Sequence, residues 1–331
     1  FVMKNILLLC GGGGTEHEVS LVSSKYIEEC LRKVSDFNVI WVEICKDQVW
    51  RTKERVECEL RRHGELVVFD NGKELKTQIN FAVPCIHGPP GETGDIQSVF
   101  ELMGLSYLGP RSEASRNCFN KVTTKLWFDA LGIPNTPFMF LSSLEEISKA
   151  KEFMNKHGQV FVKAASQGSS VGCYQVNSKD ELDNALKDAF NYSPYVLIEK
   201  TVKARELEIS VYEYEGQIYA SDPGEIICPS KFYSYTEKYS NNSVTSTEIK
   251  AKNLDQKTID LMKKYARDAF INLKITHLSR IDFFLTQEGQ IYLNEINTFP
   301  GMTPISMFPK MMEGMGHSFP KFLEDIVRKS V

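Results

Sequence analysis

Two apolar segments near the C-terminus, 279–285 and 291–297, include the polar residues Arg280, Asp282, Glu295 and Asn297. If residues 288–289 form a two-residue hairpin loop, Asp282 lies opposite Glu295 and Arg280 lies opposite Asn297. Two carboxylates about 5 Å apart repel each other unless a cation lies between them, and such oxygens suit Mg²⁺, which adds phosphate and water ligands. The two segments therefore predict a metal site formed by Asp282, Glu295 and Asn297. The alternative is a surface ion network in which Asp282 pairs with Arg280.

A lysine ends another apolar segment, directly before a loop rich in glycine and serine. Lys163 follows Val-Phe-Val, and residues 167–172 read Gln-Gly-Ser-Ser-Val-Gly. The ammonium and the loop N–H groups can bind phosphate together. The loop is not a Walker motif, because the Gly72-Lys73 pair has Val67 where that motif requires glycine. The residues predict a phosphate contact, and the alternative is a hairpin with a surface lysine.

Two glutamates adjoin other apolar segments. Glu199 leaves the segment Leu197-Ile198 and could accept a hydrogen bond from an adenine amine or a ribose hydroxyl; a solvated strand end is equally consistent. Glu16 follows a run of glycines, but Glu16 or His17 stands where a dinucleotide fingerprint needs its third glycine. At the start of a helix, Glu16 predicts binding of a cationic group such as a substrate ammonium. The alternative is a favourable interaction with the helix dipole.

The elements that must position these residues begin with an α/β pattern. Strand and helix segments alternate over the first hundred residues or so, which predicts a parallel α/β domain whose strand ends point into a cleft. Strands are expected at 4–10, 38–45 and 80–87, and helices at 18–33 and 95–103.

From residue 121 the pattern is that of α+β structure. The expected helices are 121–131, 143–157 and 255–273, and the expected strands are 160–164, 173–176, 195–200, 206–213 and 217–221, followed by the two strands of the metal segments. The polar stretch 229–246 is long enough to form a lid. A chain of 331 residues exceeds what one core usually organises, and we predict domains at 1–110, 111–200 and 201–331.

Composition excludes several classes of function. The net charge is -4 and no basic stripe is present, so we expect no nucleic-acid partner. The longest apolar stretches, such as 6–10, are too short to span a membrane, so we expect a cytoplasmic protein without a membrane partner. The eight cysteines form no Cys-x-x-Cys pair and the six histidines show no metal-ligand spacing, which disfavours a zinc enzyme.

Nine segments, in sequence order, resemble the motifs of the D-alanine–D-alanine ligase family in the ATP-grasp superfamily. They are Gly-Gly-Thr-Glu16-His-Glu-Val-Ser-Leu, His87-Gly-Pro-Pro-Gly-Glu-Thr-Gly94, Lys121, Lys163, Gly168-Ser-Ser-Val-Gly172, Leu-Ile-Glu199-Lys, Phe232-Tyr-Ser-Tyr-Thr-Glu-Lys238-Tyr239, Arg280-Ile-Asp282 and Asn294-Glu-Ile-Asn-Thr-Phe-Pro-Gly-Met-Thr303. The resemblance covers essentially the whole chain. It implies an α/β ATP-grasp fold, α+β in part, with a nucleotide cleft between two α+β domains.

The resemblance also implies a nucleotide site. ATP phosphates would contact Lys121, Lys163, Lys238 and the flap residues Gly168, Ser169, Ser170 and Val171. Adenine and ribose would contact Glu199, Val202 and Glu206. Two Mg²⁺ or Mn²⁺ ions would be bound by Asp282, Glu295 and Asn297, with a monovalent cation as a further candidate. Ala164 and Thr201 depart from the family's usual proline and aromatic residue, so we expect the packing around adenine to differ from that of the family.

For the substrates, the resemblance implies that Glu16 binds the ammonium of a first D-alanine in a network with Ser169 and Tyr239. The oxyanion would be stabilised by Arg280 and the N–H of Gly301. The remaining substrate positions would be His87, Lys238, Ser306 and Met307. The implied reaction is ATP-dependent formation of D-alanyl-D-alanine through a D-alanyl phosphate, in a homodimer. The alternatives are D-serine or D-lactate as second substrate, or another ATP-grasp carboxylate–amine ligation.

Overall fold

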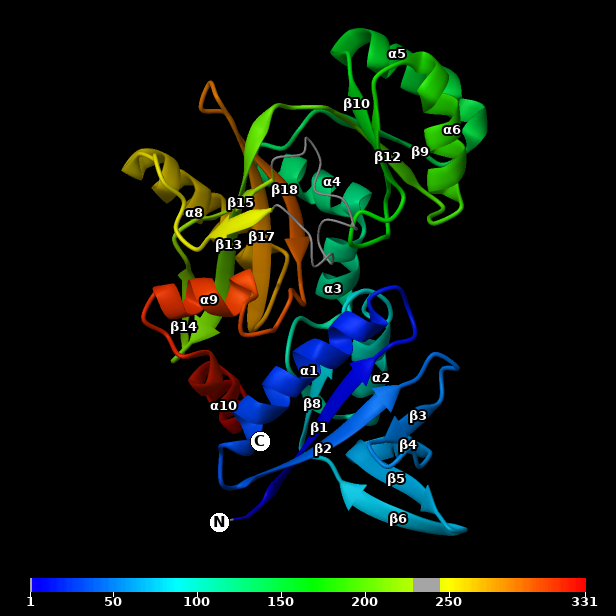
Figure 1. The fold of residues 1–331 in the computed structure, drawn as a ribbon, viewed down its shortest axis with the longest axis vertical. Coiled ribbons are helices and arrows are strands. Elements are labelled where there is room, and N and C mark those ends of the chain that lie inside the picture. The colour runs from blue at the N-terminus through cyan, green and yellow to red at the C-terminus, as the bar shows by residue number, and fades with distance from the viewer. Residues whose placement is uncertain (1, 229–244) are drawn as a thin grey trace.

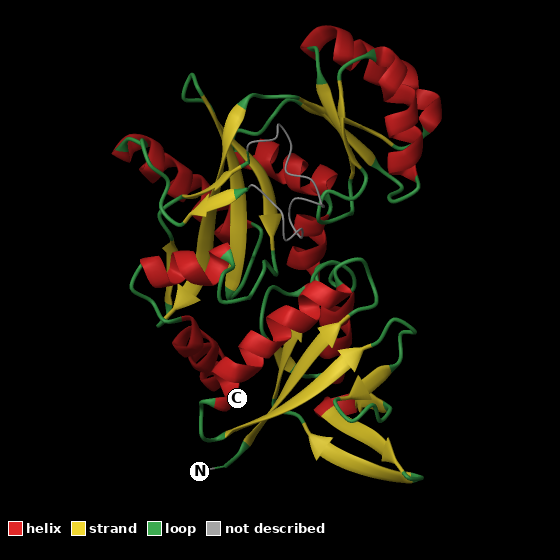
Figure 2. Cartoon of the chain, in the orientation of Figure 1, coloured by secondary structure: helices red, strands yellow, loops and turns green. Residues whose placement is uncertain are grey.

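The computed structural model of the chain describes residues 2–228 and 245–331. It contains three larger sheets, which we call the N-terminal, central and C-terminal sheets, and a small antiparallel sheet at the lower edge of Figure 1. Helices cover the larger sheets, as Figure 2 shows in red. The mixed α/β class predicted from the sequence is confirmed.

The N-terminal sheet has the strand order β3-β2-β1-β7-β8. Four of its strands are parallel, and β3 pairs antiparallel with β2 at the edge. The strands are β1 (Lys4–Gly11), β2 (Phe37–Ile44), β3 (Trp50–Thr52), β7 (Phe81–Cys85) and β8 (Ser106–Tyr107), and the helices beside them are α1 (His17–Arg32) and α2 (Asp95–Met103). The predicted parallel α/β pattern is therefore confirmed for this sheet.

The small antiparallel sheet lies between β3 and β7 in the chain and was not predicted. Its strands are β4 (Cys58–Arg61), β5 (Glu65–Asp70) and β6 (Lys73–Gln78), with the short helix η1 (Arg62–Gly64) between the first two. Most side chains of β6 are exposed, so no alternation of apolar and polar residues marks this strand in the sequence.

The central sheet is antiparallel, with the order β11-β10-β12-β9. Its strands are β9 (Phe138–Leu141), β10 (Val160–Ala164), β11 (Cys173–Val176) and β12 (Val196–Lys200). The helices α5 (Ile147–His157) and α6 (Lys179–Phe190) lie together beside it (Figure 1), and their apolar side chains share a core with its strands. The predicted helix 143–157 begins with a separate turn, η2 (Leu144–Glu146), and α6 was not predicted.

The C-terminal sheet has the order β16-β15-β13-β17-β18, and β14 pairs with β13. Its strands are β13 (Ala204–Tyr214), β14 (Gln217–Ala220), β15 (Gly224–Ile227), β16 (Ser246–Glu248), β17 (Leu278–Thr286) and β18 (Ile291–Asn297). The helices α3 (Ser112–Phe119), α4 (Lys121–Leu131) and α8 (Gln256–Asn272) contribute Cys118, Phe128 and Phe270 to its core. The predicted lid lies almost wholly outside the described residues.

The two C-terminal helices join the N-terminal and C-terminal sheets. They are α9 (Met307–Gly314) and α10 (Phe319–Ser330). Phe319 and Phe322 of α10 are buried in one core with Ile27 of α1 and Tyr212 of β13. Arg328 adds an ion pair to Asp36, with 2.9 Å between Nη2 and Oδ1. This shared core fixes the orientation of α1, which a predicted substrate residue, Glu16, directly precedes.

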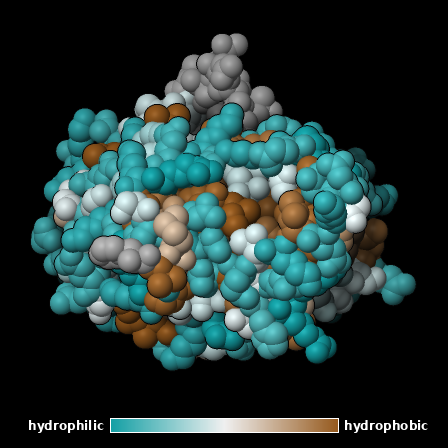
Figure 3. All heavy atoms as spheres, turned by 90° about the horizontal axis from the view of Figure 1, so that it is seen from below, coloured by the Kyte–Doolittle hydropathy of each residue, from teal (hydrophilic) through white to brown (hydrophobic). Residues whose placement is uncertain are grey.

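The face seen from the N-terminal side is mostly hydrophilic, with hydrophobic residues gathered near its middle (Figure 3). Within residues 2–228 and 245–331, no helix combines the length and the apolar character needed to cross a membrane.

Candidate active site

A cavity of about 1320 Å³ lies between the three larger sheets. Most of the predicted site residues within the described ranges line it, and they come from all three parts of the chain: Glu16, His87, Lys121, Lys163, Gly168, Ser169, Ser170, Glu199, Val202, Glu206, Arg280, Asp282, Glu295, Asn297, Gly301, Ser306 and Met307. Val171 belongs to the same loop but is not part of the cavity wall. Lys238 and Tyr239 lie outside the described residues.

The hairpin of β17 and β18 places the predicted metal residues opposite each other. Asp282 pairs with Glu295, and Arg280 with Asn297, as predicted. The predicted two-residue loop is wrong, because Leu285 pairs with Ile291 and the loop is one residue longer. A bulge lies between the pairs Phe283–Leu293 and Asp282–Glu295. It leaves Asn294 without a strand partner and shifts the register back by one residue.

Arg280 and Asp282 form an ion pair inside the cavity. The Nε and Nη2 atoms of Arg280 donate to the two carboxylate oxygens of Asp282 at 2.8 Å, and Asn297 Nδ2 donates to Asp282 Oδ2 at 3.0 Å. The alternative prediction placed this ion pair at the surface. That placement is wrong, because the side chains of Arg280 and Asp282 are only 21% and 15% exposed. Burial would lower the pKa of Arg280, but Asp282 and Glu208 raise it well above its usual value.

The donor set at the hairpin is two carboxylates and one amide. Across the described ranges, no group of three or more His, Cys, Asp or Glu side chains could hold a metal ion. Asp282 and Glu295, joined by the amide oxygen of Asn297, instead fit a hard cation that takes further oxygen ligands from phosphate and water. Lys121 lies nearby, with 3.7 Å between its Nζ and Glu295 Oε2, so positive charge already faces this carboxylate.

Glu199 is buried between two lysines. Its Oε1 atom lies 2.8 Å from Lys125 Nζ, and its Oε2 atom contacts Lys163 Nζ. The two lysines outweigh the effect of burial and lower the pKa of Glu199 well below its usual value. Glu199 is therefore no solvated strand end, and Lys163, 12% exposed, is no surface lysine. The sequence analysis missed Lys125, although it lies on the buried face of α4 with Val122 and Phe128.

Glu16 meets the flap at the start of α1. It is the residue before the first turn of the helix, and Ser169 Oγ donates to its Oε1 atom at 2.5 Å. Ser169 and Ser170 have φ values of 51° and 62°, so the flap turns through the left-handed region at two consecutive serines. The contact joins the N-terminal part of the chain to the central part at the predicted ammonium site.

His87 is held by a chain of hydrogen bonds that the sequence analysis missed. Ser23 Oγ lies 2.8 Å from His87 Nε2, and His87 Nδ1 lies 3.1 Å from the carbonyl oxygen of Phe299. Burial lowers the pKa of His87, so the ring is neutral. A neutral ring that donates from Nδ1 to the carbonyl accepts from the Ser23 hydroxyl at Nε2. This chain ties α1 to the segment that carries Gly301.

A second buried carboxyl group, Glu92, was also missed. Its Oε2 atom accepts a hydrogen bond from the N–H of Gly88 at 2.7 Å. Burial, together with the Glu16 carboxylate, raises the pKa of Glu92 to about 8. Glu92 is therefore neutral at neutral pH.

The turn before α9 carries the remaining substrate residues. Ser306 Oγ accepts from the N–H of Thr303 at 3.0 Å and lies 2.7 Å from Thr303 Oγ1. Met307 is buried and begins α9. Any side chain at Gly301 would place its Cβ 3.0 Å from Ser306 Oγ, so glycine allows the backbone to approach this turn closely.

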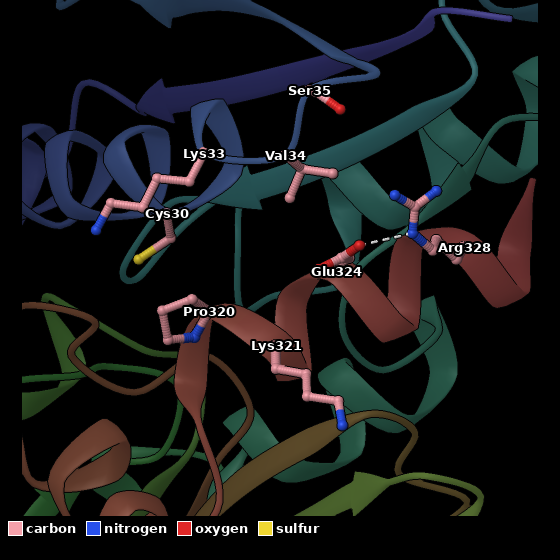
Figure 4. Close-up of a pocket in the computed structure, with 8 residues that line it drawn as sticks. All are labelled: Cys30, Lys33, Val34, Ser35, Pro320, Lys321, Glu324 and Arg328. Carbon is pink, nitrogen blue, oxygen red and sulfur yellow. Dashed lines mark hydrogen bonds and ion pairs between the residues drawn. The ribbon is translucent and has the colours of Figure 1, made fainter. Parts of the chain in front are cut away.

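A smaller surface pocket of about 430 Å³ lies between α1 and α10 (Figure 4). Three of its charged side chains are engaged in ion pairs: Arg328 contacts Glu324 and Asp36, and Lys321 contacts Glu215. It contains none of the predicted site residues. The large cavity is therefore the candidate active site.

Known proteins match the chain along nearly its full length. Residues 5–110 match the family described as D-ala D-ala ligase N-terminus, and residues 127–328 match D-ala D-ala ligase C-terminus. A D-alanine–D-alanine ligase of Vibrio atlanticus is 55% identical over 99% of this chain and 98% of its own length.

Solved structures agree with the sequence matches. D-alanyl-alanine synthetase A from Vibrio cholerae has a TM-score of 0.94 and 53% identity, covering 100% of this chain and 99% of its own. The VanG D-Ala:D-Ser ligase from Enterococcus faecalis has a TM-score of 0.88 at 26% identity, covering 99% and 100%. Matches of this extent and identity mean that the chain belongs to the D-alanine–D-alanine ligase family, whose structures have the ATP-grasp fold.

Proposed function

We propose that the chain is an ATP-dependent ligase that joins two D-alanines into D-alanyl-D-alanine and releases ADP and phosphate. The observation that carries this proposal is the cavity itself. It combines two lysines, a pair of opposed carboxylates and an arginine on one side with the Glu16–Ser169 contact on the other. Phosphate-binding and ammonium-binding groups thus share one space, as joining a carboxylate to an amine requires.

The nucleotide lies along the central sheet. Lys121 and Lys163 neutralise its phosphates, with the flap residues 168–171 over them. Adenine and ribose contact Glu199, Val202 and Glu206, which line the cavity. The two lysines come from the start of α4 and the end of β10, which adjoin each other, because the N–H of Lys121 donates to the carbonyl oxygen of Ala165 at 2.8 Å.

Asp282, Glu295 and Asn297 would hold two Mg²⁺ or Mn²⁺ ions, which when bound neutralise charge on the transferred phosphoryl group. The protein supplies the other charged groups. Asp282 already positions Arg280, and Lys121 faces Glu295. These contacts keep the cationic side chains extended toward the same end of the cavity.

The chemistry takes place in two steps. A carboxylate is a poor electrophile, so a carboxylate oxygen of the first D-alanine attacks the γ-phosphorus, and ADP leaves. Glu16 binds the ammonium of this D-alanine and orients it. The ammonium of the second D-alanine first loses a proton to solvent, and the resulting amine attacks the acyl carbon. The C–N bond forms as the C–O bond to phosphate breaks, and the second proton lost from nitrogen leaves with the phosphate. Arg280 and the N–H of Gly301 stabilise the negative charge that develops on oxygen.

The identity of the second substrate is supported by sequence identity. The relative named a D-alanine–D-alanine ligase is 55% identical, and the one named a D-Ala:D-Ser ligase is 26% identical. We assign the second D-alanine to the turn with Ser306 and Met307, with Lys238 at its carboxylate. Tyr239, which the family resemblance places in the first-substrate network, completes the site.

Phosphate release tests this proposal. The protein is incubated with ATP and Mg²⁺ and one of D-alanine, L-alanine, or D-alanine mixed with D-serine or D-lactate, and products are identified by mass. We expect D-alanyl-D-alanine from D-alanine and no product from L-alanine. A mixed product with D-serine or D-lactate in preference to the D-alanine dimer would reassign the second substrate. Absence of D-alanine-dependent phosphate release would contradict the proposal.

The cellular setting follows from the reaction. ATP as a substrate supports a cytoplasmic location, and the dipeptide supplies the end of a peptidoglycan precursor. The homodimer implied by the family resemblance remains a prediction, and light scattering during size-exclusion chromatography tests it by measuring the mass of the particle.

A further inference from the structure

Lys125 is a buried cation that contacts the carboxylate of Glu199 from outside the cavity. Its side chain is 1% exposed, and its Nζ atom donates to Glu199 Oε1 at 2.8 Å and to Thr136 Oγ1 at 3.1 Å. The Thr136 hydroxyl donates in turn to Glu199 Oε1 at 3.0 Å, and the ring centre of Phe138 lies 4.9 Å from the ammonium. Lys125 does not line the cavity.

Lys163 holds the other oxygen of the same carboxylate from the cavity side. Its Nζ atom contacts Glu199 Oε2 and lies 3.5 Å from Asn294 Oδ1. Lys163 lines the cavity, and its side chain is more exposed than that of Lys125. One carboxylate thus has two cations, of which one is enclosed by protein and one can reach a ligand.

Burial lowers the pKa of Lys125, and the adjacent Glu199 carboxylate opposes this shift by stabilising the charged ammonium. With both ammonium groups charged, the two lysines and Glu199 carry one net positive charge. An incoming phosphate competes with Glu199 for Lys163, because both are anions. Depriving a buried carboxylate of its only cation is strongly unfavourable. With Lys125 in place, Glu199 keeps a cation and a hydroxyl donor when Lys163 turns away. Without Lys125, the remaining Lys163–Glu199 pair is neutral, and a phosphate could recruit Lys163 only by leaving Glu199 unpaired.

We propose that Lys125 is a positioning residue that serves as the permanent counter-charge of Glu199 and so frees Lys163 to bind the phosphates of the nucleotide. This inference rests on the proposed function, because it requires a nucleotide in the cavity. Loss of Lys125 is therefore expected to weaken binding of the phosphates and to leave binding of the nucleoside nearly unchanged.

The test compares ADP with adenosine, which differ only by the phosphates. Their dissociation constants are measured by calorimetry, with Mg²⁺ present, for the wild type and for Lys125→Met. We expect ADP to bind Lys125→Met about tenfold more weakly or worse, and adenosine to change by less than about twofold, as for the loss of one charge-assisted contact. Equal weakening of both ligands, or unchanged ADP binding, would overturn the proposal.

The matched control is Lys263→Met. Lys263 also pairs with a carboxylate, with 2.7 Å between its Nζ and Asp222 Oδ1, and both residues lie outside the cavity wall. For the Lys263→Met protein, the ratio of the ADP affinity to the adenosine affinity is expected to equal that of the wild type. A drop in this ratio like that of Lys125→Met would mean that any lost ion pair has the effect, and would overturn the specific role of Lys125.

A second pair of variants keeps the test decisive if Lys125→Met fails to fold. Glu199→Gln removes the charge that needs a cation, so adding Lys125→Met to it is expected to leave the ratio of ADP to adenosine affinity unchanged. A further loss of ADP affinity in the double variant would contradict the inference. Wild-type protein that binds neither ADP nor ATP would instead overturn the proposed function, and the inference with it.

Discussion

Single residues of the cavity owe their properties to partners that lie far away in the chain. Asp282 is restrained by Arg280 and Asn297 from its own hairpin, whereas Glu199 depends on a helix and a neighbouring strand. In each case a cationic side chain already lies against the carboxylate, and at Glu199 the two lysines lower its pKa. The chemistry of the site therefore depends on arrangements of charge that exist before any substrate binds.

Replacing Asp282 by Asn tests the metal and arginine side of the site. The change removes one metal ligand charge and the bidentate partner of Arg280, so we expect phosphate release to fall by about a hundredfold or more and to require a higher Mg²⁺ concentration. Phosphate release is measured over a Mg²⁺ titration. The control is Asp268→Asn, which breaks only an exposed ion pair with Lys264 on α8. An Asp282→Asn protein with wild-type Mg²⁺ dependence would contradict the metal assignment.

Glu92 predicts a dependence of stability on pH. Its pKa is raised from 4.5 to about 8 in the folded protein, so its neutral form contributes stability that is fully present below about pH 4.5 and is lost as the pH rises to about 8. Glu92→Gln cannot titrate and keeps an acceptor for the Gly88 N–H. We expect the melting temperature of Glu92→Gln, relative to the wild type, to increase steadily from pH 5 to pH 8. A difference that does not change with pH would refute the prediction.

At the scale of elements, the hairpin of β17 and β18 owes its register to two irregularities. The loop carries Gly289 at φ 83°, and the bulge at Asn294 brings Asp282 and Glu295 opposite each other. The bulge also brings Asn294 onto the cavity wall beside Glu295. A regular hairpin with the same loop would place these carboxylates out of register by one residue.

Gly289→Ala tests whether the loop requires a left-handed backbone conformation at residue 289. A Cβ at Gly289 meets nothing within 4 Å, so the cost comes only from the left-handed conformation. We expect the free energy of unfolding to fall by about 1 kcal/mol, measured by urea denaturation. The control is Gln287→Ala in the same loop, where φ is not positive. Equal effects of the two substitutions would mean that the loop tolerates a side chain at Gly289.

At the scale of the whole molecule, the cavity exists because three sheets are held at fixed positions around it. The core shared by α1, β13 and α10 joins the first and last parts of the chain. The hydrogen-bonded chain from Ser23 through His87 to Phe299 crosses the same boundary closer to the cavity. Glu16 and Gly301 are therefore positioned relative to each other by the shared core outside the cavity and by this hydrogen-bonded chain in its wall.

Phe322→Ala tests this connection. Phe322 is fully buried in the shared core, so its loss is expected to lower the free energy of unfolding by about 3–5 kcal/mol, measured by denaturant titration. The control is Phe69→Ala on β5, where the ring is 38% exposed and the loss is expected to be below about 1 kcal/mol. A small effect at Phe322 would show that α10 contributes little to holding the sheets together.

The local features of this protein could be predicted from its sequence. Apolar runs and their spacing predicted β10, α2 and α4 at their observed bounds. The pairing of Asp282 with Glu295 was also predicted, although the predicted length of the hairpin loop was wrong. These features depend on the periodicity of neighbouring residues, which the sequence displays directly. The exposed strand β6 lacks such a pattern and was missed.

Only the tertiary structure decided which distant residues meet. Nothing in the sequence pairs Lys125 with Glu199, links Ser23 to His87 and Phe299, or raises the pKa of Glu92. Periodicity shows that the face of α4 carrying Lys125 is buried, but it does not show what covers that face. Burial, charge pairing and hydrogen-bond partners depend on how the three sheets pack, because these interactions act through space between segments that are remote in the chain.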